Sequence, residues 1–311
     1  MISYNELSKH SRRFLAMTGY TVEEFQALLP HFQVQFEKHV ETHTLDGKSR
    51  AKRQYSAYKN SPLPTIEDKL LFILIYLKQG TTQEVHAALF GMHQPDANLW
   101  IHLLHLILNQ ALDALGELPV REAEAFNLED DLEEEQELYF FHDGTERPIP
   151  RPKDKEAQKE YYSGKKKQHT IKNIVVINPL CRILFLTRTC EGKKHDKKAA
   201  DEAGYDFPEG STLFQDAGFQ GFTVAGVTVI QPKKKPRGKE LTSEDKESNC
   251  AISKIRVRVE HAIGGVKRYR IVKDKIRNWK KGFRDQVMET CCGLHNFRLN
   301  FRPWHYEALG T

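Results

Sequence analysis

The chain has 311 residues, 39% of them hydrophobic, and a net charge of +5, which is enough chain for a catalytic domain with a helical appendage. It contains no run of about 18 uncharged apolar residues and no apolar signal core at its start, so we expect neither a membrane-spanning helix nor a secretory signal. Its five cysteines include no C-x-x-C pair, so we expect reduced thiols and a cytoplasmic protein without a membrane partner.

Residues 1–60 predict a helical segment followed by a basic loop. Thr21 and Glu24 have the spacing of a capping box, and apolar residues follow them at helical intervals up to Val40. Pro30 predicts an interruption, so this stretch is expected to form one or two helices. Residues 48–59 are basic and include two tyrosines. A solvated loop and a DNA contact are alternative roles for them.

Residues 61–128 predict a helical domain. Helices are expected at 66–78, 82–90 and 98–115, with turns at Gly80 and Pro95 and a capping box from Thr81 to Glu84. This close order is typical of a helix-turn-helix, which places its recognition helix in a DNA groove. The last helix of the three contains no Lys or Arg. Core packing and groove reading are therefore alternative roles for it.

The sign of the charge changes after an acidic run at 129–137. This run is expected to be a linker, because its like charges repel one another. Residues 1–137 have a net charge of −9 and residues 138–311 have a net charge of +14. A positive surface field attracts phosphate backbones without regard to sequence, so the C-terminal part is the expected polyanion binder.

From residue 138 onward the hydrophobic period changes from helical to extended. LYFFHDG, IKNIVVINP and RILFLTR predict an antiparallel meander. A helix from His195 with Asp196 as its N-cap, two more strands and a long helix from Leu241 to Tyr269 follow. This is the element order of a ribonuclease H-like domain. The expected fold class is α/β: a ribonuclease H-like mixed sheet flanked by helices at 138–300, preceded by an all-α helix-turn-helix region and followed by a tail at 301–311.

Three carboxylates fall on elements that this fold brings together. Asp143 and Asp216 are each expected at a strand end, on neighbouring strands, and Glu260 lies on the long helix. Carboxylates that share divalent cations suit magnesium or manganese, and a metal pair activates a water or a DNA 3′-hydroxyl. Arg256 and Lys267 lie on the helix face of Glu260, four residues before it and seven after it, so both are candidate phosphate contacts.

Two further basic segments are candidate DNA contacts. The first is a turn after Gly164, and the second is a loop bounded by prolines, for which a nuclear import signal is the alternative. A metal site at His195 and a zinc site at Cys291 and His295 are alternatives to a helix cap and to core packing. The candidate DNA-contact residues of the two basic segments are Lys165, Lys166, Lys167, Lys233, Lys234, Lys235 and Arg237.

Five blocks, DGTERPIPRP, YYSGKKKQHT, GKKHD, QDAGFQG and RVRVEHAIGGVK, follow one another along the chain. In that order they resemble the blocks of the DDE superfamily transposases of bacterial insertion sequences, whose catalytic domain is shared with eukaryotic Harbinger elements. The resemblance covers about residues 60–300. It implies Asp143, Asp216 and Glu260 as the catalytic triad, with Mg²⁺ as cofactor and Mn²⁺ as a substitute. Between Asp216 and Glu260 lie 43 residues, which leaves little room for a large inserted domain.

The implied function is that of a DNA transposase. Such an enzyme cleaves DNA at the inverted-repeat ends of its element and joins the 3′-OH to target DNA by two-metal phosphoryl transfer. The implied partners are the inverted-repeat ends, target DNA and further copies of the chain in a synaptic complex, on nucleoid DNA. Two alternatives stay open: a domesticated, non-catalytic DNA-binding protein, and a ribonuclease H-like nuclease acting on RNA hybrids or junctions.

Overall fold

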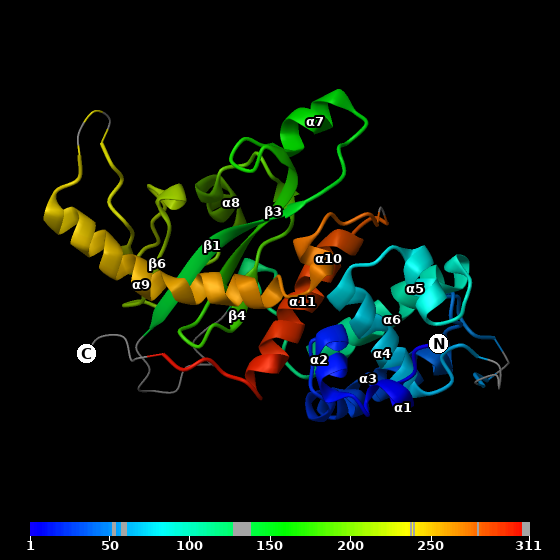
Figure 1. Ribbon diagram of the computed structural model, residues 1–311. Helices are drawn as coiled ribbons and strands as arrows, with labels where there is room; N and C mark the ends of the chain where they lie inside the picture. The colour runs from blue at the N-terminus through cyan, green and yellow to red at the C-terminus, as the bar shows by residue number, and fades with distance from the viewer. Residues whose placement is uncertain are drawn as a thin grey trace. The chain divides into compact units, whose positions relative to one another are not determined.

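The computed structural model describes residues 1–51, 54–56, 61–126, 138–236, 238, 240–278 and 280–306. Two compact units divide the chain (Figure 1): unit 1 contains Met1–Leu118 and Val266–Phe301, and unit 2 contains Pro119–Gly265 and the chain from Arg302 onward. The acidic run at 129–137, part of the basic stretch at 48–59, and Arg237 lie outside the described residues. No helix within the described residues is long and apolar enough to cross a membrane.

The N-terminal helices of unit 1 include one long helix, α3 (Val22–Thr42). The capping box is confirmed: the Thr21 hydroxyl accepts from the Glu24 N–H, and the Glu24 carboxylate accepts from the Thr21 N–H. The expected interruption at Pro30 is wrong, because α3 continues through it. Proline removes one backbone hydrogen bond there, and the buried apolar face of α3 offsets that loss. The shorter helices before it are α1 (Tyr4–Leu7) and α2 (Ser11–Thr18).

The three helices expected at 61–128 are present as α4 (Ile66–Gln79), α5 (Gln83–Leu89) and α6 (Gln94–Ala114). α6 begins four residues before its expected start, because Pro95 fits the first turn of a helix, where its missing N–H costs nothing. The cap of α5 is Thr82 and not Thr81, so the second expected capping box is wrong. Ten residues of α6, from Ala97 to Leu112, are buried, which favours core packing over groove reading for that face of the helix.

The chain returns to unit 1 after the long helix of unit 2. It forms α10 (Arg270–Lys273) and α11 (Phe283–Leu299), and α11 is buried along most of its length. The Tyr20 hydroxyl donates to the Leu294 carbonyl at 2.6 Å, and the Asn296 amide donates to the Glu117 carbonyl at 2.9 Å. These contacts join the C-terminal helices to the N-terminal ones. The units therefore differ from the expected division, in which one catalytic domain extended to residue 300.

Gly80 ends α4 in the left-handed region, with φ +61°, and a Cβ there would lie 3.1 Å from the backbone of Arg270 and Ile271. We expect Gly80→Ala to lower the free energy of unfolding by about 1–3 kcal/mol, because a left-handed alanine is strained and its methyl group would press on α10. Denaturant unfolding measures this loss. Gly116→Ala is the control: Gly116 has φ +67° but no atom within 4 Å of its Cβ position. An equal loss in both variants would contradict the crowding argument.

Unit 2 is built on a sheet that has seven strands within the described residues, in the order β2-β3-β1-β6-β7, with β4 and β5 also paired to β3. β1, β3 and β4 form the expected antiparallel meander, and β6 runs parallel to both β1 and β7. The strands are β1 (Tyr139–Pro148), β2 (Tyr162–Ser163), β3 (Gln168–Ile177), β4 (Ile183–Leu186), β5 (Cys190–Glu191), β6 (Thr212–Phe214) and β7 (Thr228–Ile230).

Helices of unit 2 connect these strands. α8 (Asp196–Ala203) precedes β6, and α9 (Ser243–Val266) is the expected long helix. α7 (Lys155–Tyr161), between β1 and β2, was not expected. The N-cap of α8 is His195, whose side chain makes no cap hydrogen bond, so the expectation that Asp196 caps this helix is wrong. Short 3-10 turns lie at η1 (Ala123–Ala125) and η3 (Ala217–Phe219).

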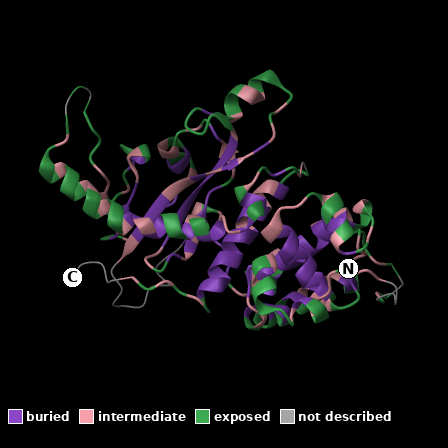
Figure 2. Cartoon of the chain, in the orientation of Figure 1, coloured by how far each residue is buried: buried purple, intermediate pink, exposed green. Residues whose placement is uncertain are grey.

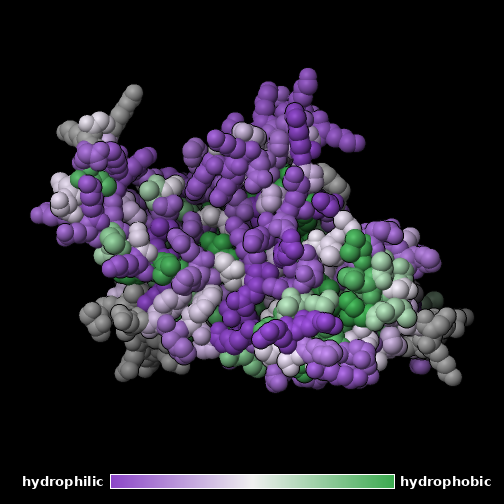
Figure 3. All heavy atoms as spheres, viewed as in Figure 1, coloured by the Kyte–Doolittle hydropathy of each residue, from purple (hydrophilic) through white to green (hydrophobic). Residues whose placement is uncertain are grey.

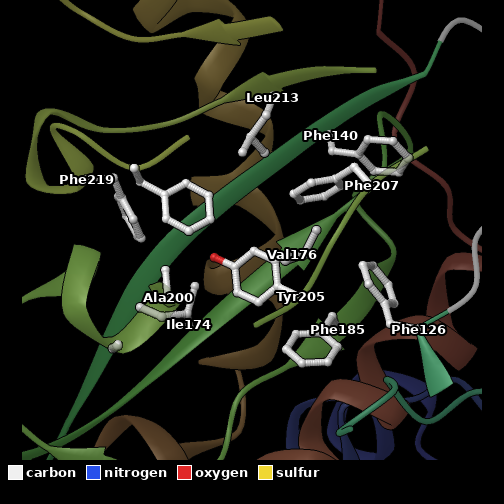
Figure 4. Packing of buried hydrophobic residues seen from close by; sticks show 12 residues of the cluster. Phe126, Phe140, Ile174, Val176, Phe185, Ala200, Tyr205, Phe207, Leu213 and Phe219 are labelled. Carbon is white, nitrogen blue, oxygen red and sulfur yellow. The ribbon is translucent and has the colours of Figure 1, made fainter. Parts of the chain in front are cut away.

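Aromatic and aliphatic side chains pack between the sheet and α8 (Figure 4). Phe140, Ile174 and Leu213 from three strands pack with Ala200 of α8 and with Tyr205. The strands β3, β4 and β6 are mostly buried (Figure 2). Side chains alternate between the faces of a strand, so Phe140 faces α8 together with His142 and Gly144, while Asp143 faces the other way. The core thus packs against the face of β1 opposite to Asp143.

Candidate active site

Asp143 lies in the middle of β1. The expectation that it ends a strand is wrong, because β3 pairs with β1 beyond this point, from Phe141 to Pro148, with Val175 opposite Asp143. Its Oδ1 accepts from the Gly144 N–H at 2.7 Å. Burial raises the pKa of Asp143 to about 6, against the opposing effect of the Arg256 guanidinium.

Asp216 follows the end of β6, as expected, and caps the turn η3. Its Oδ1 accepts from the Ala217 N–H at 2.6 Å. β1 and β6 are parallel neighbours with Phe141 opposite Phe214. Asp143 lies two residues after Phe141, and Asp216 lies two residues after Phe214. The two acids are therefore in register. The expectation that the two strands lie side by side is confirmed.

Arg256 of α9 faces both carboxylates. Its Nη2 lies 3.8 Å from Asp143 Oδ2, and its Nη1 lies 3.8 Å from Asp216 Oδ1. The arginine side chain is only 9% exposed. One guanidinium therefore balances two acids that would otherwise repel each other. Its expected contact with a DNA phosphate stays a prediction.

Glu260 lies on α9 one turn after Arg256 and is exposed. Residues four apart lie on one face of a helix, so its side chain leaves α9 on the Arg256 side. Among the residues that the structure describes, no three His, Cys, Asp or Glu side chains form a group able to hold a metal. The structure thus brings Asp143 and Asp216 together and leaves Glu260 outside a three-carboxylate cluster. The carboxylate oxygens of Asp143 and Asp216 suit a divalent metal, which prefers oxygen ligands.

A buried ion pair lies on the α8 face of the sheet, and the sequence did not predict it. Lys172 Nζ lies 2.7 Å from Asp196 Oδ1 and 3.9 Å from Glu146 Oε1. The ammonium also donates to the Lys194 carbonyl at 2.7 Å. The Lys172 side chain is 7% exposed. Lys172 therefore joins β3, β1 and the start of α8.

Glycines leave the space that the Asp196 carboxylate occupies. A Cβ on Gly144 would lie 2.7 Å from Asp196 Oδ1, and one on Gly218 would lie 3.0 Å from its Oδ2. These glycines follow Asp143 directly and Asp216 by two residues, so the Asp196 carboxylate contacts the backbone next to both acids from the α8 side of the sheet. The GKKHD block is the sequence signal for this residue, although the pattern by itself predicts a helix cap.

The residues before the two acids also contact each other. His142 is buried between the Tyr205 hydroxyl, 2.6 Å from Nδ1, and Gln215 Oε1, 3.0 Å from Nε2. The Gln215 amide nitrogen donates to Gln231 instead, at 2.7 Å. His142 Nε2 therefore carries the proton and donates to Gln215, while Nδ1 accepts from Tyr205. This hydrogen bond couples β1 to the segment after β6 directly before Asp143 and Asp216.

Burial lowers the pKa of His142 to about 3, against an ordinary value of 6.5. Below pH 6.5 the unfolded chain binds a proton at this histidine that the folded chain does not bind. We therefore expect the free energy of unfolding to decrease as the pH is lowered, by roughly 1 kcal/mol at pH 5.5 from this residue. Denaturant unfolding at pH 7.5 and 5.5 measures the change. His142→Gln should reduce the dependence on pH, and an unchanged dependence would remove His142 as its source.

The turn that carries Lys165, Lys166 and Lys167 joins β2 to β3, and all three lysines are exposed. Lys167, the last of the three, lies eight residues before Val175, the β3 residue that pairs with Asp143. At 3.3 Å per residue this is roughly 25 Å from the acids. Hydrophilic side chains cover the neighbouring helix α7 (Figure 3). The contact of these lysines with DNA stays a prediction, at a place away from the acids.

Lys233, Lys234 and Lys235 are exposed in the loop before α9. Lys233 pairs with Asp245 of α9 at 2.8 Å, and Lys235 pairs with Glu240. Two of the three cations are thus partly balanced by local acids. Lys267 follows the last residue of α9 and belongs to unit 1.

Two family models match the helical region and the region that contains the paired acids. A family model for a DDE superfamily endonuclease matches residues 142–296, and a model for the helix-turn-helix of DDE superfamily endonucleases matches residues 61–113. No solved structure matches the chain.

Two curated relatives cover part of the chain. "Probable transposase for insertion sequence element IS702" of Microchaete diplosiphon is 33% identical over 166 residues, which are 53% of this chain and 58% of that protein. "Putative transposase for insertion sequence element IS112" of Streptomyces albus G is 25% identical over 212 residues, 67% of this chain and 72% of that protein. With the family models on the helix-turn-helix and on the region of the paired acids, the chain belongs to the DDE superfamily.

Proposed function

We propose that the chain is a DNA transposase that cleaves the inverted-repeat ends of its insertion sequence and joins the 3′-OH to target DNA. The observation that carries this proposal is the pair Asp143 and Asp216, in register on neighbouring parallel strands and facing one guanidinium. Glu260 lies one helical turn after Arg256 on α9 and is the third acid of the proposed triad. The relatives, named as transposases of insertion sequences, support the same reaction.

The strand order supports a ribonuclease H-like fold for unit 2. Three antiparallel strands, β1, β3 and β4, are followed by α8 and then by β6 and β7, which run parallel to β1. In this order the first strand lies in the centre and carries Asp143, and Asp216 follows the end of β6 next to it. α9 then supplies the third acid.

Asp143, Asp216 and Glu260 are the proposed ligands of Mg²⁺, with Mn²⁺ as a substitute. A bound metal pair would supply activation of the water or 3′-hydroxyl and stabilisation of the leaving oxygen. The hydrogen bond from His142 to Gln215 holds the two strands that carry the aspartates. Arg256 limits the repulsion between these carboxylates and presents a cation to the scissile phosphate.

The other parts of the chain have proposed roles in binding DNA. The helix-turn-helix region at 61–128 binds the element ends, and the segment 129–137 links it to the catalytic region that begins at 138. Lys165–Lys167, Lys233–Lys235, Arg237 and Lys267 contact the backbone of nucleoid DNA. Inverted ends are related by a two-fold axis, so copies of the chain pair in the synaptic complex.

A cleavage assay on matched substrates tests the function. The full chain is incubated with Mg²⁺ and with three duplexes: one that carries the inverted repeat flanking its gene, one with that repeat scrambled, and an RNA–DNA hybrid. The proposal expects nicks at the repeat boundary and strand transfer to a target plasmid. Preferred cleavage of the hybrid would identify a ribonuclease H-like nuclease. End binding without cleavage in either metal would identify a non-catalytic DNA-binding protein.

A further inference from the structure

Unit 1 contains a strongly basic segment that the helix-turn-helix match does not include. Residues 267–284, called here the basic segment, hold nine Lys or Arg and one acid, Asp274. They follow α9 in the chain, yet they belong to the same compact unit as α4, α5 and α6. Apart from residue 279 the structure describes all of them.

The basic segment is fixed against α4. Ile271, Val272 and Ile276 are buried, which turns the charged side chains between them outward. The Lys78 ammonium donates to the Arg268 carbonyl at 3.0 Å, and the absence of a side chain at Gly80 allows α10 to approach the end of α4. The position of the cations relative to the helix-turn-helix is therefore set by packing.

The helix-turn-helix itself lacks cations for DNA. α5 and α6 contain no Lys or Arg, and α4 contains two lysines. Lys69 is buried and donates to the carbonyls of Leu63 and Thr65, while Lys78 donates to Arg268. Neutralisation of phosphates by Lys and Arg supplies much of the affinity of proteins for DNA, so an end-binding domain whose helices hold few of these residues needs cations from another source.

A groove of about 430 Å³ lies between the helix-turn-helix and the basic segment. Gln83, Gln94 and Asn98 line one wall, and Arg270, Lys275 and Arg277 line the other. The three cations are exposed, and one of them, Arg270, pairs with Asp274 at 2.8 Å. The Gln94 amide donates to Gln83 Oε1 at 2.5 Å, which links the start of α6 to α5.

We propose that the helix-turn-helix and the basic segment form one composite surface that binds duplex DNA at the ends of the element. This inference rests on the proposed function and names the residues that bind its substrate. Asn and Gln amides match the edge of adenine in the major groove, whereas Arg and Lys hold phosphates without reading sequence. Gln83, Gln94 and Asn98 therefore read bases, and Arg270, Lys275 and Arg277 position the duplex.

The charge of the surface is tested with the triple variant Arg270→Gln, Lys275→Gln, Arg277→Gln of the full chain. Band shifts without divalent metal measure its affinity for the inverted-repeat duplex at several salt concentrations. Each lost phosphate contact lowers the salt slope by about 0.9, so we expect a slope smaller by roughly 2–3 and an affinity lower by about 10- to 100-fold at low salt. The matched control is Arg12→Gln, Arg13→Gln, Lys38→Gln, which removes three exposed cations of α2 and α3.

The amides are tested with Gln83→Ala, Gln94→Ala and Asn98→Ala together. We expect the preference for the repeat over a scrambled duplex to fall about tenfold or more, with the salt slope unchanged. Wild-type affinity and slope in the cation variant would overturn the proposal, as would an equal loss in its control or an unchanged preference in the amide variant. Cleavage of the same duplex by the wild-type chain with Mg²⁺ reports separately on the proposed function, because these band shifts contain no metal.

Discussion

Replacing Asp216 with Asn is expected to abolish cleavage of end-containing DNA while the affinity for that DNA stays unchanged or rises slightly. The amide keeps the shape of the side chain but removes one charged oxygen ligand. Losing several kcal/mol of metal stabilisation slows the reaction by roughly a thousandfold or more. DNA is held mainly by Lys and Arg, and removing a carboxylate reduces the repulsion of phosphate.

Band shifts and cleavage with Mg²⁺ or Mn²⁺ on one duplex measure both effects, and calorimetric titration of Mn²⁺ measures the lost metal affinity. Asp201→Asn is the matched control: Asp201 is an exposed carboxylate of α8 that pairs with Lys197. It should cleave at the wild-type rate. Cleavage by Asp216→Asn within about tenfold of wild type would remove Asp216 from the mechanism. Joint loss of binding and folding would make its role structural.

Lys172→Met is expected to lower the free energy of unfolding by about 3–5 kcal/mol. Lys172 is the shared cation of Asp196 and Glu146, and removing one partner of a buried ion pair leaves uncompensated charge in the interior. Denaturant unfolding, followed by circular dichroism, measures the loss.

Lys197→Met is its control, because Lys197 pairs with Asp201 at 2.6 Å on the surface of α8, where such pairs contribute about 1 kcal/mol or less. The double variant Lys172→Met, Asp196→Asn removes one of the two stranded charges. It should recover part of the stability, as coupled neighbours do. A loss below about 1 kcal/mol in Lys172→Met would show that water or another cation already compensates the acids.

Local patterns in the sequence predict the order of the main helices and strands. The Thr21 capping box, the apolar periods of α4 and α9 and the extended runs of β1, β3 and β4 depend on residues a few positions apart, and these elements are present. The ribonuclease H-like element order also predicted that the strands of Asp143 and Asp216 are neighbours, whereas the register of the two acids comes from the strand pairing itself.

Expectations from the sequence are wrong at positions where contacts with distant residues override a local pattern. Gly144 resembles a strand end, but β3 pairs with β1 past it, and its missing side chain leaves space for Asp196. Asp196 resembles an N-cap, but Lys172, 24 residues earlier, attracts its carboxylate. Pro30 resembles a break, but the buried face of α3 keeps that helix continuous.

The sequence by itself determined the family resemblance, the change of charge sign and the order of the main helices and strands, because period, caps and charge are local properties. Only the tertiary structure decided that Arg256 faces both aspartates, that Lys172 pairs with Asp196, and that the basic segment joins the helix-turn-helix. These contacts join residues up to 190 positions apart, as Lys78 and Arg268 are. Such pairs form only when the whole apolar surface of each unit is packed, so no local pattern specifies them.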